Sequence, residues 1–151
     1  MTEWPLAELI PHAGDMILID QVLSVDEEQI RTRLTVRADG LFNHADGSLP
    51  AWLGIELMAQ SVAAYAGCKA RNKGEAVNLG FLLGSRKFDC NVTRFPLGSE
   101  LHIHAVRSLQ DDNGMGMFEC TLTGPGIEAF ARLNVYCPPN TADYLAEGAP
   151  A

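Results

Sequence analysis

The chain has 151 residues, of which 47% are hydrophobic and 20% are charged. This composition suits one globular domain, long enough to bury roughly 70% of the surface of its unfolded chain. The formal net charge of −8 argues against nucleic acid as a partner, because contacts to phosphates require a basic face. No apolar run approaches the length of about 18 residues that a membrane-spanning helix needs, so no membrane partner is expected.

We expect a single domain over residues 1–151, with a core over about 9–137 and a loose tail over 138–151. The segment 1–15 lacks a basic region followed by an apolar core, so it predicts no signal peptide, and a cytoplasmic location is expected. The four cysteines are widely spaced without a C-x-x-C pair: Cys68, Cys90, Cys120 and Cys137. They are predicted to be small buried hydrophobes rather than disulfide partners or zinc ligands.

The first third of the chain predicts two strands and a loop. Residues 16–25 are apolar and β-branched, as is typical of a strand. Residues 29–36 alternate between apolar and polar character, starting with Ile30 on the apolar face, which predicts a half-buried strand. Residues 38–49 are rich in Asp and Gly and are predicted to form a loop.

One long helix is predicted next, from Pro50 or Ala51 to about Asn72. Proline is common at the first position of a helix, and Gly74 suits the end of one. Three polar residues interrupt an otherwise apolar surface: Glu56, Gln60 and Ser61. A helix that is apolar on most of its surface is predicted to be buried.

Strand-like runs dominate the rest of the chain, at residues 77–83, 86–92, 100–109, 116–123 and 128–136. Segments rich in Gly, Pro, Asn and Asp separate them, as is typical of turns between antiparallel strands. One long buried helix with about six strands predicts an α+β domain.

The run from Asn43 to Gln60, NHADGSLPAWLGIELMAQ, holds the candidate functional residues. His44 lies in the loop of small and turn-forming residues, and Glu56 lies in the apolar helix. A carboxyl among apolar side chains is costly to bury unless it is paired, protonated or used chemically. Because histidine changes its charge near neutral pH, a histidine and a carboxyl at one site can serve as base and acid.

This run resembles the active-site motif of the 3-hydroxyacyl-acyl carrier protein dehydratases of bacterial fatty-acid synthesis, which are hotdog-fold enzymes. Their pattern reads H-F-P-x-x-P-x-x-P-G-x-x-x-x-E-x-M-A-Q, and His44, Pro50, Glu56 and residues 58–60 match it. Weaker likeness follows the same order over roughly residues 9–137. The resemblance implies the hotdog fold, an antiparallel sheet wrapped around one long central helix.

The loop half of the motif departs from the family pattern. Between His44 and Pro50 the loop is two residues shorter, and Ala45 stands where the family has Phe. Ala51 stands where the family has a Gly whose backbone N–H binds the thioester oxygen of the substrate. Ala51 retains an N–H, but its methyl group narrows the space through which the thioester oxygen would approach that N–H.

The resemblance, together with the chemistry of the side chains and of the helix end, implies a role for each residue of the site. His44 would remove the proton at C2 of a 3-hydroxyacyl thioester, and Glu56 would be the general acid that helps the C3 hydroxyl leave as water. The N–H groups of Ala51 and Trp52, at the positive end of the helix, would bind the thioester oxygen as it becomes enolate-like. Gln60 is a further predicted substrate-binding residue.

No cofactor is expected for this chemistry, and no metal site is predicted. His102 and His104 alternate in a strand-like run, so both point to one face of a sheet. No Cys, Asp or third His has the spacing that would complete a metal site with them.

The expected substrate is bound to an acyl carrier protein or to coenzyme A. Acyl carrier proteins are acidic, so an enzyme that uses them needs a local positive patch. Two groups of residues are candidates: Lys69, Arg71 and Lys73, and Arg86, Lys87 and Arg94. The alternative interpretation of the first group is that its positive charges stabilise the negative, C-terminal end of the helix dipole.

An assembly of two chains is expected for two reasons. In the family the His and the acidic residue of one site come from different subunits, and pairing across a two-fold axis covers exposed sheet edges. The prediction is a homodimer or higher even oligomer, or else a heterodimer with a related hotdog subunit.

The predicted function is dehydration of 3-hydroxyacyl thioesters to trans-2-enoyl thioesters, in fatty-acid-like or polyene- and polyketide-type biosynthesis. Two alternatives stay open. The first is a hotdog acyl thioesterase, in which Glu56 or a water that it activates attacks the thioester. The second is a weakly active or inactive subunit that pairs with a catalytic paralogue, and the shortened His44 loop favours it.

Overall fold

The computed structural model describes residues 17–38, 40–72, 81–110 and 115–136. One helix and eight strands lie in this part of the chain. In chain order they are β1 (Gln21–Val25), β2 (Gln29–Thr35), β3 (Leu49–Pro50), α1 (Leu53–Asn72), β4 (Phe81–Cys90), β5 (Arg94–Phe95), β6 (Glu100–Gln110), β7 (Met115–Gly124) and β8 (Ile127–Tyr136).

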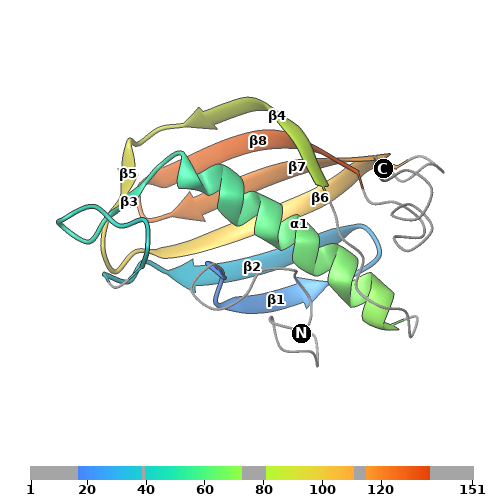
Figure 1. Ribbon diagram of the computed structural model, residues 1–151, viewed down its shortest axis with the longest axis horizontal. Helices are drawn as coiled ribbons and strands as arrows, with labels where there is room; N and C mark the ends of the chain where they lie inside the picture. The colour runs from blue at the N-terminus through green and yellow to red at the C-terminus, as the bar shows by residue number, and fades with distance from the viewer. Residues whose placement is uncertain (1–16, 39, 73–80, 111–114, 137–151) are drawn as a thin grey trace, which may run out of the picture.

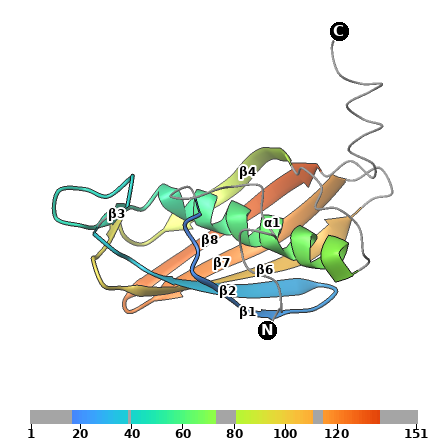
Figure 2. The ribbon, with the colours of Figure 1, turned by 60° about the horizontal axis from the view of Figure 1, so that its bottom comes forward.

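Six of the strands form one antiparallel sheet in the order β1-β2-β6-β7-β8-β4. The helix α1 lies diagonally across one face of this sheet, with β1 and β4 at the two edges (Figure 1). A view turned by 60° shows the sheet beneath the helix as a separate layer (Figure 2). The predicted α+β architecture, a sheet around one long helix, is therefore confirmed.

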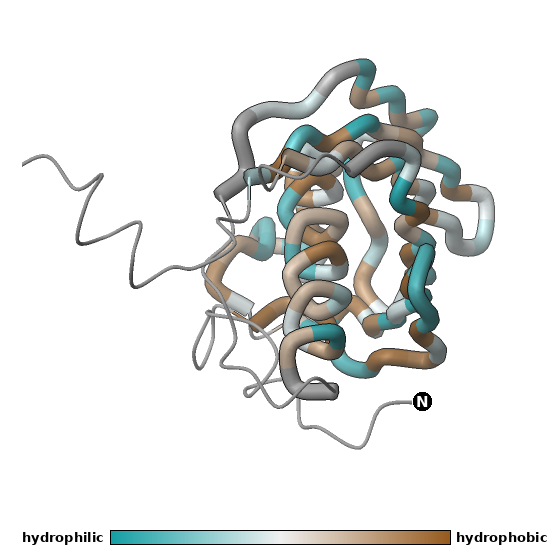
Figure 3. Tube along the Cα trace, turned by 90° about the vertical axis from the view of Figure 1, so that its right-hand side faces the viewer, coloured by the Kyte–Doolittle hydropathy of each residue, from teal (hydrophilic) through white to brown (hydrophobic). Residues whose placement is uncertain are grey.

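The alternation predicted for residues 29–36 places every second side chain in the core. Ile30, Thr32, Leu34 and Val36 are buried, while the residues between them are exposed or half-buried. Figure 3 shows strands that alternate between hydrophilic and hydrophobic residues beside a helix that is mostly pale to hydrophobic. The core lies between α1 and this apolar face of the sheet.

The helix forms because its sequence is rich in Ala, Leu, Met, Gln and Glu, which favour helical backbone. Leu53, Leu57 and Met58 are at most 1% exposed, so the first turns bury their apolar side chains completely. The prediction of a buried helix is confirmed for this face. The opposite side, which includes Glu56 and Ala59, is half-buried.

Two of the three polar interruptions of the helix are buried and bind neighbouring segments. The Ser61 hydroxyl donates to the Leu57 carbonyl (2.9 Å), so it accepts the hydrogen bond from the Thr32 hydroxyl on β2 (2.8 Å). The Gln60 side-chain oxygen accepts from the backbone N–H of Leu18 (2.8 Å). These bonds fix the rotation of α1 relative to the sheet, because buried polar groups lose free energy when they lack partners.

The beginning of the helix differs from the prediction. Leu49 and Pro50 form β3, which pairs with β5, and α1 begins at Leu53 rather than at Pro50 or Ala51. Proline has no N–H and a backbone angle that suits an extended edge as well as a helix start. The pairing with Arg94–Phe95, more than 40 residues later in the chain, decides between these two conformations.

Two other strand boundaries differ from the prediction. Strand β1 covers only Gln21–Val25 of the predicted 16–25, while Asp20 binds Arg33 and Thr35 of β2 outside the regular ladder. The runs predicted at 77–83 and 86–92 form one strand, β4, within the described residues. Two bulges interrupt its pairing with β8, and Lys87, with a φ of +55°, lies at the second.

Replacing Ser61 by Ala is expected to lower the free energy of unfolding by about 1–3 kcal/mol, because the buried Thr32 hydroxyl then loses its partner. Adding Thr32→Val to this variant should restore part of the loss, since the remaining unsatisfied group is removed. Urea denaturation of the two single variants and the double variant measures both effects. A double variant no more stable than Ser61→Ala would contradict this assignment.

Candidate active site

His44 lies in a closed turn that precedes β3. Its backbone N–H donates to the Ser48 carbonyl (2.8 Å), and its carbonyl accepts from the Gly47 N–H (2.9 Å). Gly47 has a φ of +86°, which favours glycine, and a side chain there would press on Leu97. The turn therefore uses the main chain of His44 for closure and leaves the residue exposed at the surface.

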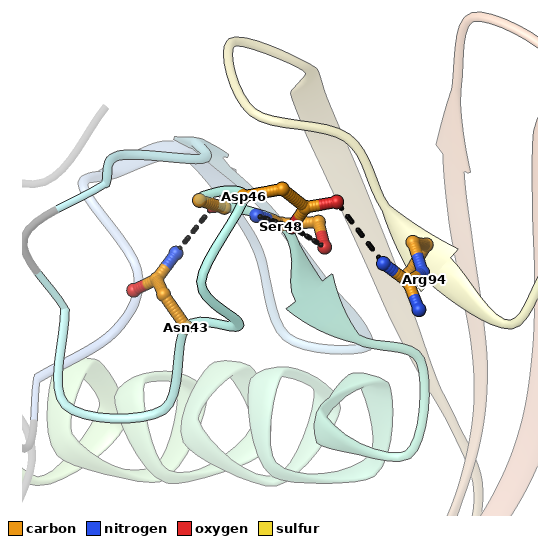
Figure 4. Close-up of polar contacts among 5 residues, drawn as sticks. Asn43, Asp46, Ser48 and Arg94 are labelled. Carbon is orange, nitrogen blue, oxygen red and sulfur yellow. Dashed lines mark hydrogen bonds and ion pairs between the residues drawn. The ribbon is translucent and has the colours of Figure 1, made fainter.

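The side chain of Asp46 lies between Ser48 and Arg94 and contacts both, as Figure 4 shows. One carboxylate oxygen accepts from the N–H of Ser48 (3.0 Å) and from its hydroxyl (2.6 Å). The other oxygen lies 3.0 Å from a guanidinium nitrogen of Arg94 on β5. On the other side of the loop, the Asn43 amide nitrogen donates to the carbonyls of Arg37 (2.7 Å) and Gly47 (2.6 Å).

The charge state of Asp46 follows from these contacts. The hydrogen bonds from Ser48, and then the Arg94 guanidinium, lower the pKa of the Asp46 carboxyl from 3.8 to about 2. A carboxyl whose pKa is lower in the folded protein contributes stability above its unfolded pKa. The contribution is lost as the pH falls through the folded value, between about 4 and 2.

The residues at the start of the helix are held by the small sheet. The Ala51 N–H donates to the Thr93 carbonyl (3.1 Å), which continues the pairing of β3 with β5. Binding of a thioester oxygen by this N–H would therefore have to replace that bond. Trp52, the next residue, is 63% exposed. It precedes Leu53, the first residue of α1, so its N–H has no acceptor within the helix.

Glu56 lies in the first turn of α1 and is half-buried. The Gln60 side-chain nitrogen donates to a Glu56 carboxylate oxygen at 3.2 Å. Because the Gln60 oxygen accepts from the Leu18 N–H, the amide nitrogen must face Glu56. Gln60 is fully buried, so the structure places it beside Glu56 rather than on an exposed surface.

The loop that carries His44 and the first turn of α1 lie at the same end of the molecule (Figure 1). Strand β3 and the residues Ala51 and Trp52 connect them. Among the described residues, no hydrogen bond or ion pair joins His44 to Glu56 within one chain. The single chain therefore brings the two predicted catalytic residues to one end of the fold without pairing them.

The other histidines and the cysteines of the described residues lie elsewhere. His102 and His104 are on the face of β6 opposite to its buried residues, and His102 lies 3.6 Å from Glu100. No group of three or more potential metal ligands occurs in the described part of the chain. Cys90 and Cys120 are free thiols, Cys68 is buried on α1, and burial raises the pKa of Cys120 to about 12. Cys137 and His12 lie outside the described residues.

Sequence reasoning missed Asp46, Ser48 and Arg94 as residues that shape the site. The available signal was local: an Asp two residues before a Ser is typical of a turn in which the carboxylate accepts from the backbone. The contact with Arg94 had no local signal, because 48 residues separate the two partners. By sequence alone, Arg94 belongs to the cations that could face an acidic carrier protein.

Comparison with known proteins gives one family and two dehydratase relatives. The family model described as ApeP-like, ApeP dehydratase, matches residues 4–146. The 3-hydroxyacyl-[acyl-carrier-protein] dehydratase FabZ of Bartonella quintana is 29% identical over 127 residues, which cover 81% of this chain and 79% of that protein. The dehydratase heterocomplex ApeI:P from Xenorhabdus doucetiae contains a chain that is 34% identical. That match covers 99% of this chain and 100% of the other, with a TM-score of 0.86.

A more distant solved structure has the same fold. The PaaI protein from the phenylacetic acid degradation operon of E. coli matches with a TM-score of 0.59 and 18% identity, over 78% of this chain and 82% of the other. At this identity the likeness concerns the fold alone. Together with the dehydratase heterocomplex, it confirms the hotdog fold predicted from the sequence. In the described residues, no helix has both the length and the apolar character needed to cross a bilayer.

The Asp46 carboxyl is expected to titrate near pH 2 in the folded protein, which carbon NMR of its side chain can measure. Ser48→Ala should raise this pKa toward 3.8, because the hydroxyl hydrogen bond is the largest cause of the shift. Arg94→Gln should also raise it, through loss of the neighbouring positive charge. A wild-type value near that of an ordinary aspartate would contradict the network of Figure 4.

Proposed function

This chain belongs to the ApeP-like dehydratase family and dehydrates 3-hydroxyacyl thioesters, and we propose that His44 and Glu56 are the catalytic residues. The observation that carries the proposal is the family match over residues 4–146, together with the position of the His44 loop and the first turn of α1 at one end of the fold. The similarities favour neither the thioesterase nor the inactive subunit.

In the proposed reaction His44 removes a proton from C2 of the substrate, next to the thioester carbonyl. The exposed position of His44 supports this role, because its imidazole can meet a substrate that arrives from solvent. Glu56 donates a proton to the C3 hydroxyl, which leaves as water, and the electrons of the C2–H bond form the C2–C3 double bond. The product is a trans-2-enoyl thioester.

The thioester oxygen becomes negatively charged as the C2 proton leaves. The start of α1 provides a positive end of a helix for it, and the Trp52 N–H is the proposed donor. The Ala51 N–H joins it only if the bond to the Thr93 carbonyl is exchanged for one to the substrate. Gln60 orients Glu56 through the 3.2 Å hydrogen bond, so its proposed contribution to substrate binding is indirect.

A structural role for Glu56 remains the competing interpretation. The hydrogen bond from Gln60 gives one carboxylate oxygen a partner, and a negative charge in the first turn stabilises a helix through its dipole. The nearly isosteric Glu56→Gln substitution separates the two roles, since it preserves volume and removes the acid.

We propose an acyl carrier protein as the source of the substrate, supported by the name of the FabZ relative. Lys69 is half-buried and Lys87 is exposed, and an acidic carrier could contact both cations. Lys69 also lies 3.4 Å from the Tyr65 hydroxyl and 5.4 Å from the centre of its ring. Arg94 is engaged with Asp46 instead. A cytoplasmic location is part of the same proposal.

His44→Ala and Glu56→Gln are each expected to lower kcat for dehydration by about a hundredfold or more, because general acid–base catalysis contributes roughly 10²–10⁴-fold. Circular dichroism should show that both variants remain folded. The measurement is the formation of enoyl product from a 3-hydroxyacyl carrier substrate. Retention of most activity by His44→Ala would contradict the assignment of the base. Thioester hydrolysis without enoyl product by the wild type would instead favour the thioesterase.

We propose that two hotdog chains complete the site, with His44 of one chain near Glu56 of the other. The related dehydratase from Xenorhabdus doucetiae is described as a heterocomplex, which supports a related hotdog subunit as the partner. Within the described residues the sheet ends at β1 and β4, whose outer backbone groups are suited to pairing with a second chain.

If this chain forms homodimers, a mixture of His44→Ala and Glu56→Gln chains should recover about a quarter of the wild-type rate, because about half of the dimers are mixed and each has one complete site. Light scattering gives the size of the assembly, alone and with a related hotdog subunit. A monomer that is fully active on dilution would exclude the shared site. Full activity only with the related subunit would identify the heteromer.

A further inference from the structure

Strand β5 connects the His44 loop to the hydrophobic core. Phe95 is fully buried, and the adjacent residue Arg94 points to the opposite side, as successive residues of a strand do. Leu49 and Pro50 pair with these two residues in the small sheet. The backbone of Arg94 is therefore fixed by the burial of its neighbour.

The guanidinium of Arg94 in turn holds Asp46. Asp46 receives two hydrogen bonds from Ser48 through one oxygen and contacts Arg94 through the other. Ser48 is 2% exposed, so the group that Asp46 holds is itself fixed in the protein interior. The carboxylate thus joins a buried position of the loop to a strand anchored in the core (Figure 4).

The backbone of His44 is hydrogen-bonded directly to Ser48, a member of this network. Its N–H donates to the carbonyl of Ser48, the residue that Asp46 holds, and its own carbonyl accepts from Gly47. Moving Asp46 would therefore change the backbone on both sides of the turn. The loop is two residues shorter than the family pattern, and these contacts close it over the shorter span.

We propose that Asp46, held by Arg94, is a positioning residue that fixes the His44 imidazole relative to the start of α1. This inference rests on the proposed function, in which His44 is the base. An exposed ion pair contributes little to global stability, so its effect should fall on the placement of the loop. A displacement of about 1 Å in a catalytic group can cost about a hundredfold in rate, so a small change in placement has a measurable effect.

The test is Asp46→Asn, which keeps the size of the side chain. Its amide oxygen can still accept from Ser48, but the NH₂ group that replaces the second oxygen cannot pair with Arg94. The matched control is Glu119→Gln, which removes the same charge from a pair with Arg132 at 3.1 Å on β7 and β8. Arg94→Gln and Arg94→Lys complete the set, because Lys retains the positive charge.

The expected result for Asp46→Asn is a fall in kcat of about tenfold or more with little change in KM or Tm. The NMR signal of the His44 ring should shift or broaden, as expected for an imidazole with several placements. Arg94→Gln should reproduce both effects, Arg94→Lys should restore part of the rate, and Glu119→Gln should change neither kcat nor the His44 signal.

The NMR signal separates this inference from the proposed function. If His44→Ala keeps its activity while Asp46→Asn still changes the His44 ring signal, the base assignment fails and the positioning of the loop stands. If neither Asp46→Asn nor Arg94→Gln changes kcat or the ring signal, the positioning role is wrong. If Asp46→Asn fails to fold, Arg94→Gln decides by the same two measurements.

Discussion

Burial of α1 against one face of the sheet is the interaction on which the rest of the structure depends. The helix brings apolar residues such as Leu57 and Met58 into a core from which water is excluded. Buried polar groups on the same helix then need hydrogen-bond partners. Gln60 binds the Leu18 N–H, and Ser61 binds the Thr32 hydroxyl. These contacts determine the rotation of the helix. They therefore also determine where Glu56 lies.

The two candidate catalytic residues are placed by different constraints. Glu56 follows the packing of α1, since it belongs to the first turn and is bound by Gln60. His44 belongs to a loop, and its placement depends on the pairing of β3 with β5 and on polar contacts at the surface. Loops that carry function are commonly supported by a rigid scaffold in this way. In this chain the buried side chain of Phe95 provides the connection to that scaffold.

A site made from two chains would explain why one chain places these residues at the same end without joining them. The chain belongs to a family of dehydratases, and a relative over nearly its whole length occurs in a heterocomplex of dehydratase subunits. The shortened loop, which by its length alone favours an inactive subunit, is closed by its own hydrogen bonds. A short loop of this kind is compatible with catalysis, because preorganisation depends on contacts rather than on loop length.

The sequence by itself determined the main features of the fold and the family. The alternation at residues 29–36 and the apolar run before Asn72 predicted a half-buried strand and a buried helix, because periodicity reports which face meets the core. The spacing of His44, Pro50 and Glu56 identified the dehydratase resemblance. These features are local, so a single sequence suffices to predict them.

Only the tertiary structure decided the start of the helix, the continuity of β4 and the contacts around His44. Pro50 suits either a strand or a helix start, and its pairing with Arg94 selects the strand. Residues 81–90 form one strand, with two register shifts in its pairing with β8, where the sequence predicted a break. Asp46 and Arg94 are 48 residues apart, and the side-chain partner of a surface carboxylate has no periodic signal in the sequence. Such contacts are set by the path of the whole chain, because folding alone brings distant segments within hydrogen-bonding distance.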